Sequence, residues 1–105
     1  MSTPRVRIPS SARPGEVVEI RTLLEHPMES GINPDASGRR RPRTMLKRFE
    51  ARADGAVVFA VDFGNGSATN PSVSFFYRVE RTTRLELVWE PESGSAIRAE
   101  GMIRV

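Results

Sequence analysis

The turn His26-Pro27-Met28-Glu29 combines the residue types most able to do chemistry in this chain. An imidazole beside a carboxylate can act as a general base, and imidazole, thioether and carboxylate groups bind transition metals. Yet His26 is the single histidine among 105 residues, and there is no cysteine. A hydroxyl nucleophile needs a positioned base, and Ser30 is close but lies in no recognisable elbow. A zinc or iron site needs about four ligands, so we expect no catalytic residue, no metal and no cofactor here.

A second candidate group is the basic cluster Arg39, Arg40, Arg41 and Arg43, in a chain whose net charge is +3. Clustered arginines suit phosphate contacts, so nucleic-acid binding is one interpretation. Most such binders add a broad basic face and interleaved aromatic residues, which this sequence lacks. A solvated loop, or one that docks on an acidic partner, fits the cluster better. We therefore keep DNA binding only as a distant alternative and expect no nucleic acid as the partner.

Length and composition restrict the class of protein. A chain of 105 residues, 38% hydrophobic and 28% charged, is ordinary for one globular domain spanning residues 1–105. No apolar run approaches the ~20 residues that span a bilayer, so we expect no membrane partner. Residues 1–9 contain no apolar stretch typical of a secretory signal. This predicts a cytoplasmic protein unless the chain is exported with a signal-bearing partner.

Alternation of apolar and polar residues runs from end to end, which is typical of half-buried strands. The expected strands are residues 5–8, 16–24, 45–53, 56–63, 72–80, 85–90 and 97–105. Asp54-Gly55 favours a tight hairpin, and residues 26–43, rich in proline and glycine, form the longest loop. Seven short antiparallel strands in about 100 residues indicate an all-β, immunoglobulin-like β-sandwich. Its two sheets would bury the aromatic residues Phe49, Phe59, Phe75 and Trp89.

Two strands carry apolar residues on both faces. In residues 56–63 the pattern places Val57, Phe59, Val61 and Phe63 on one face, and Val58 and Ala60 on the other. Phe76 faces away from the predicted core. Apolar groups on an outer face need cover, either from a partner protein or from the 26–43 loop folded over the sheet.

Over nearly its whole length, the chain resembles the SoxZ family. Members of this family are subunits of the sulfur-compound carrier of bacterial thiosulfate oxidation. The matching stretches are residues 5–9, 15–20 with 22–23, 26–31, 41–49, Asn70-Pro71 and Val88-Trp89. The chain departs from the family pattern at Ser72, where an aromatic residue is common, and at residues 90–94, where the turn is usually richer in Asp. Superoxide reductases, also β-sandwiches, share a His-Pro-Met turn. Their iron needs four histidines and a cysteine, which this chain lacks.

The resemblance implies an immunoglobulin-like sandwich and an obligate partner, SoxY, which holds sulfur intermediates on a cysteine in a mobile arm. SoxY also carries the export signal, so the pair is expected in the periplasm. Transient contacts are implied with a c-type cytochrome, a manganese hydrolase and a sulfane dehydrogenase. We expect a non-catalytic scaffold subunit, or alternatively a SoxYZ-like carrier module of another periplasmic oxidation system. The candidate contact residues are His26, Met28, Glu29, Arg39, Arg40, Arg41, Arg43, Asn70 and Phe76.

Overall fold

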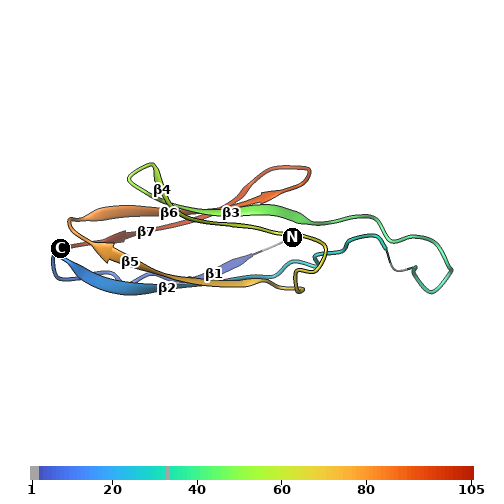
Figure 1. Ribbon diagram of the computed structural model, residues 1–105, viewed down its shortest axis with the longest axis horizontal. Helices are drawn as coiled ribbons and strands as arrows, with labels where there is room; N and C mark the ends of the chain where they lie inside the picture. The colour runs from blue at the N-terminus through green and yellow to red at the C-terminus, as the bar shows by residue number, and fades with distance from the viewer. Residues whose placement is uncertain (1–2, 33) are drawn as a thin grey trace.

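A computed structural model describes residues 3–32 and 34–105 of the chain. Its strands are β1 (Pro4–Arg7), β2 (Glu16–Leu24), β3 (Leu46–Ala53), β4 (Ala56–Asp62), β5 (Ser72–Val79), β6 (Thr83–Pro91) and β7 (Ile97–Ile103). They form two antiparallel sheets, ordered β1-β2-β5 and β4-β3-β6-β7, that lie face to face (Figure 1). The predicted seven-stranded, immunoglobulin-like sandwich is confirmed, with strand ends shifted by at most two residues. The described ranges contain no helix suited to crossing a membrane.

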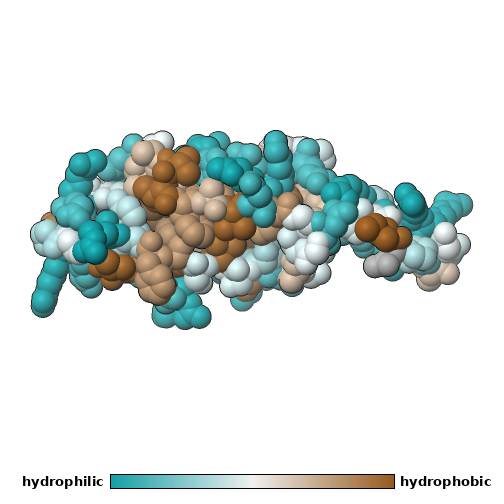
Figure 2. Space-filling view, viewed as in Figure 1, coloured by the Kyte–Doolittle hydropathy of each residue, from teal (hydrophilic) through white to brown (hydrophobic). Residues whose placement is uncertain are grey.

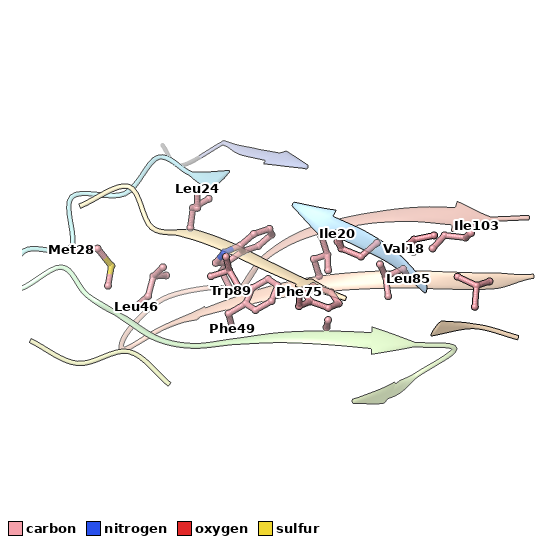
Figure 3. Close-up of a cluster of buried hydrophobic side chains, with 14 of the residues drawn as sticks. Val18, Ile20, Leu24, Met28, Leu46, Phe49, Phe75, Leu85, Trp89 and Ile103 are labelled. Carbon is pink, nitrogen blue, oxygen red and sulfur yellow. The ribbon is translucent and has the colours of Figure 1, made fainter. Parts of the chain in front are cut away.

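The core lies between the two sheets, where the alternating apolar residues meet. In β2, Val18, Ile20, Thr22 and Leu24 are buried, while Glu19, Arg21 and Leu23 alternate with them and face outward. The predicted aromatic centre is present: the Phe49 ring centroid lies 5.1 Å from that of Trp89, and Phe59 stacks on Phe75 at 4.7 Å. Figure 3 shows Phe49, Phe75 and Trp89 converging from the two sheets. Burying one such side chain stabilises the fold by roughly 1.5–3 kcal/mol, which is why the pattern predicted the architecture.

The prediction that Val57 faces the core is wrong. The register between β3 and β4 shifts, so that Arg52 faces Val57 while Ala51 faces Phe59. A bulge of this kind inserts one extra residue into a strand and reverses the alternation beyond it. Val57 and Val58 are consequently 51% and 42% exposed. Phe59 still packs against the core, as predicted, and so do Val61 and Phe63.

The two sides of the sandwich differ. Beside β1 and β7 the chain closes the gap, because the Ala12 N–H donates to the Arg104 carbonyl at 2.9 Å and the Arg104 N–H donates to the Ser10 carbonyl at 3.0 Å. On the opposite side, β4 pairs only with β3 and β5 only with β2 among the described residues. We call this second side the open side. Phe59, Val61, Phe63 and Val73 line it, and Val57, Val58 and Phe76 are exposed on the two edge strands that border it.

The long loop does not fold over either sheet, so the alternative in which it covers the outer apolar residues is wrong. Its two limbs pair with each other instead: Glu29 and Thr44 exchange two backbone hydrogen bonds of 2.7 Å, and Pro34 bridges Arg40 farther out. The resulting basic ribbon, residues 29–44, projects from one end of the sandwich (Figure 1) and lengthens a molecule that measures 56 × 20 × 19 Å. Pairing within the ribbon satisfies backbone groups that would otherwise require cover from the sheet.

Candidate functional site

The turn at the base of the ribbon is fastened to the loop that precedes β5. The backbone N–H of His26 donates to Asn70 Oδ1 at 2.8 Å, and the Asn70 N–H donates to the His26 carbonyl at 2.8 Å. These two candidate residues, 44 positions apart in sequence, are therefore reciprocal partners. Their joint effect is to hold the start of the ribbon against the sandwich.

His26 is a buried structural group of this turn. Its side chain is 6% exposed, and Nδ1 accepts the N–H of Met28 at 3.0 Å. Burial lowers the pKa of His26, which favours the neutral imidazole. Only the neutral ring has a lone pair at Nδ1 to accept this hydrogen bond. The geometry thus gives His26 the task of capping the turn, with little surface left for another molecule.

Met28 and Glu29 complete the base of the ribbon. Met28 has a φ of 49°, in the left-handed region that side chains other than glycine rarely adopt. Its buried side chain lies near Leu46 at one end of the core (Figure 3), which offsets the backbone strain. Glu29 accepts the N–H of Gly31 at 3.1 Å and lies 3.8 Å from the Arg41 guanidinium. Gly31 is needed here because a Cβ would approach the Arg41 carbonyl to 3.0 Å, at a φ of 80°.

Arg43 is an anchor of the ribbon rather than a free cation. Its guanidinium forms two hydrogen bonds of 2.6 and 2.8 Å with the Glu92 carboxylate. It also donates to the Ser30 carbonyl at 3.0 Å and to Asn65 Oδ1 at 2.9 Å. The hydrogen bond with Glu92 raises the pKa of Arg43 and lowers the pKa of Glu92. Bidentate pairs of this kind fix geometry as well as charge.

The remaining arginines of the cluster are presented toward solvent. Arg39, Arg40 and Arg41 are all exposed. Asp35 orders the turn between them, accepting the Ser37 hydroxyl at 2.7 Å and the Arg39 N–H at 3.0 Å. The Ser37 hydroxyl is the main cause of the lowered pKa of Asp35. The ribbon therefore displays three guanidinium groups on a hydrogen-bonded scaffold.

Phe76 lies apart from these residues, on the outer face of β5, where its side chain is 72% exposed. The open side contains a hollow of about 420 Å³. Its lining is made of the apolar residues Phe59, Val61, Phe63, Ala68, Pro71 and Val73, together with Asp62, Ser67, Ser72 and Ser74. Figure 2 shows the brown, hydrophobic surface that spans β4 and β5. The candidate residues thus fall into three places: the ribbon base, the ribbon itself and the sheet beside the open side.

Sequence reasoning missed the open side as a surface. The sequence predicts Phe59 in the core, with Val61 and Phe63 on the same face of the strand. All three contact the core and also line the hollow. Only the pairing order reveals that β4 and β5 are edge strands on the same side. The one sequence signal was the run of apolar residues on both faces of β4. As for inorganic chemistry, residues 3–32 and 34–105 contain no group of three or more side chains suited to holding a metal ion.

Solved structures with the same architecture include two kinds of protein. A superoxide reductase (neelaredoxin) from Ignicoccus hospitalis superposes with a TM-score of 0.71 at 18% identity, over 98% of this chain and 80% of the other. The sulfur carrier protein SoxY from Chlorobium limicola f thiosulfatophilum gives a TM-score of 0.65 at 17% identity, over 97% and 74%. At such identities the likeness shows the fold alone. Among curated proteins, none matches this chain by sequence.

Family membership follows from the sequence itself. Residues 6–101 match the profile of the family described as "Sulphur oxidation protein SoxZ". The match covers all seven strands, apart from the ends of β1 and β7, and includes the ribbon and the His26–Gly31 turn. It confirms the resemblance inferred from the residues alone. The chain therefore belongs to the SoxZ family, the sulfur-oxidation proteins of the Sox system.

Proposed function

We propose that this chain is a non-catalytic scaffold that binds a SoxY-like subunit and helps to present its cysteine-bound sulfur intermediates to the enzymes of thiosulfate oxidation. The observation that carries the proposal is the SoxZ family match over residues 6–101. The chemistry of the chain supports it, since a protein without a cysteine needs a partner to supply the carrier thiol. The pair would be exported together and would work in the periplasm.

The open side is the surface we assign to the SoxY-like subunit. Stable heterodimers bury roughly 800 Å² on each partner and place apolar residues at the centre. The open side offers apolar side chains around a hollow of about 420 Å³ and two edge strands, β4 and β5. The outer face of the four-stranded sheet is a poorer candidate, because its ion pairs would have to be desolvated. The side beside β1 and β7 is already closed by backbone hydrogen bonds.

The basic ribbon is suited to the second part of the role. Arg39, Arg40 and Arg41 project from the end of the sandwich on an ordered support. Their charges would attract anionic sulfur groups on the carrier cysteine or acidic surfaces of the cytochrome, hydrolase and dehydrogenase. His26, Met28, Glu29 and Asn70 would then contribute by holding the ribbon in place.

The test is co-expression with the SoxY-like subunit encoded in the same genome, followed by size-exclusion chromatography with light scattering. We expect a 1:1 complex with the wild-type chain. The double variant Val57→Glu/Phe76→Glu should abolish it, because these exposed side chains stand on β4 and β5, the two edge strands that border the open side. Met102→Glu is the matched control: Met102 is 40% exposed on β7, away from the open side, and its variant should still form the complex.

The possible outcomes test the scaffold role and the choice of the open side as the interface separately. If the wild-type chain forms no complex, or if the chain alone turns over thiosulfate, the scaffold proposal is wrong. If the complex forms but survives the double variant, the role stands and the open side is not the interface. Tight, salt-sensitive binding to bulk DNA would instead favour the nucleic-acid alternative.

A further inference from the structure

The outer face of the β1-β2-β5 sheet carries arginines in an arrangement that the fold does not require. In the register, Arg7 of β1 lies directly opposite Arg21 of β2, and Arg5 lies two residues before Arg7 on the same face. Like charges directly opposite each other in antiparallel strands destabilise a sheet. Such a pair calls for a counter-charge.

The chain itself does not supply this counter-charge. Within residues 3–32 and 34–105, neither Arg7 nor Arg21 forms an ion pair, and Arg5 has a carboxylate of Glu25 at 3.2 Å. Glu19 is the acidic residue on the same face of β2, and it lies opposite Phe76. The arginines of the other outer face contrast with these. Arg48, Arg52, Arg84 and Arg98 each have a carboxylate within 2.9 Å.

The arginines also share a hollow. A depression of about 370 Å³ is lined by Arg5, Arg7, Arg21, Leu23 and Ser72, together with Val6 and Thr22. The register extends the polar set, because Ser72 lies opposite Leu23 and Ser74 opposite Arg21. Guanidinium groups present several N–H donors in a planar fork that matches oxyanions, and serine hydroxyls add single donors. The side chain of Leu23, on the same face as Arg21, forms an apolar part of the wall.

We propose that this hollow binds a small divalent oxyanion of the sulfate, thiosulfate or phosphate class between Arg7 and Arg21, with Ser72 as a further donor. A bound dianion converts the repulsion between the two guanidinium groups into two attractive contacts. The volume is that of a small-molecule site. An acidic protein segment would need a broader surface, whereas three of the four arginines that the described strands place on this face line one hollow. The proposal concerns this chain alone and does not depend on a SoxY-like partner.

The experiment titrates sodium sulfate into the full-length, ¹⁵N-labelled chain and follows backbone amide and arginine Nε resonances by NMR. Sodium chloride at matched ionic strength is the reference. We expect saturable shifts confined to residues 5–7, 21–23 and 72–74, with sulfate but not with chloride. Arg7→Gln and Arg21→Gln should each weaken the apparent affinity at least tenfold, about the effect of losing one charged hydrogen bond. Parallel titrations with thiosulfate and inorganic phosphate identify which oxyanion binds best.

Two further variants make the test specific. Arg98→Gln removes an exposed arginine from the other outer face and should leave the affinity unchanged. Arg7→Lys keeps the charge but removes the planar fork, so it should bind more weakly than wild type and more tightly than Arg7→Gln. Amide spectra show whether each variant is folded. Equal shifts with sulfate and chloride, or equal losses in Arg98→Gln and Arg7→Gln, would overturn the site. Tighter binding of a poly-glutamate peptide, with shifts spread beyond the hollow, would overturn the small-anion assignment.

Discussion

The two outer faces of the sandwich differ in whether their arginines are paired with carboxylates. On the β4-β3-β6-β7 face, Glu50 lies 2.8 Å from the guanidinium groups of both Arg48 and Arg52, and Glu86 accepts a hydrogen bond of 2.9 Å from Arg98. On the β1-β2-β5 face, Arg7 and Arg21 oppose each other, and neither forms an ion pair within the described residues. The first face is neutralised by its own side chains, whereas the second still has binding capacity for an anion.

The difference shows which outer face is complete without a ligand or partner. Glu50 is only 13% exposed, and its pKa is lowered first by the hydrogen bond from Arg48 and then by that from Arg52. A carboxylate so enclosed is a fixed part of the sheet. The other face has an exposed aromatic ring at Phe76 and a hollow lined by arginines. Surfaces that leave apolar groups and charges unmatched are those where ligands and partners bind.

The largest expected effect separates the inner face of β5 from its outer face. Phe75→Ala removes a buried ring that packs on Phe49 and Phe59, and should lower the free energy of unfolding by about 3–5 kcal/mol. Phe76→Ala, one residue later, should change it by less than about 0.5 kcal/mol, because this ring is 72% exposed. Urea denaturation of both variants measures the difference. A comparable loss in Phe76→Ala would mean that the outer face is structural and not available for binding.

An intermediate effect is expected on the charge-paired face. Glu50→Gln should lower the melting temperature by a few degrees, because it leaves Arg48 and Arg52 without their shared carboxylate. Glu19→Gln, on the other outer face, is the control and should have a smaller effect. Differential scanning calorimetry at pH 7 compares them. Equal shifts in the two variants would remove the distinction between the faces.

The stability that Glu50 contributes should depend on pH. The pKa of Glu50 in the folded chain is lowered from the ordinary 4.5, so the carboxylate stabilises the fold above that pH. This stabilisation is lost as the pH falls through the folded-state pKa. Thermal unfolding between pH 6 and 3 should therefore be less pH-dependent in Glu50→Gln than in wild type. Some dependence should persist, because the pKa of Glu92 is lowered too. Parallel profiles for the two proteins would contradict the role of Glu50.

The smallest expected effect is a gain in stability rather than a loss. Arg7→Gln removes one of two opposed like charges and should raise the free energy of unfolding by a few tenths of a kcal/mol at low ionic strength. Salt should reduce this gain, since screening weakens the repulsion in the wild type. Arg98→Gln should instead lose stability, because Glu86 loses a hydrogen bond. Urea midpoints in low and high salt test both signs, and a loss in Arg7→Gln would show that Arg7 is already satisfied.

Much of the fold could be predicted from local pattern. Alternation in β2 and β6 identified the buried faces because each apolar side chain that leaves water stabilises the chain independently of its neighbours. The Asp54-Gly55 hairpin was predictable for a similar reason: both residues adopt positive φ, at 49° and 89°, which such turns require. The bulge beside Ala51 was not, because it depends on how β3 and β4 pair.

The candidate site was less predictable. The sequence showed that His26 is the single histidine and that there is no cysteine. This argued against a metal or catalytic site built by this chain around His26. It could not show that His26 and Asn70 hold each other, since 44 residues separate them. Nor could it separate Arg43, which pairs with Glu92, from Arg39 and Arg40, which form no ion pair within the described residues. These roles depend on which distant groups the fold brings within hydrogen-bonding distance.

By itself, then, the sequence determined the strands, the buried aromatic centre and membership of the SoxZ family, because each depends on residue type and order along the chain. Only the tertiary structure decided which edges stay open, which arginines find a carboxylate and where Arg7 meets Arg21. The physical reason is the distance along the sequence over which each interaction acts. Burial and turn propensity act within a few residues, whereas ion pairing and exposure depend on strands that the fold places side by side.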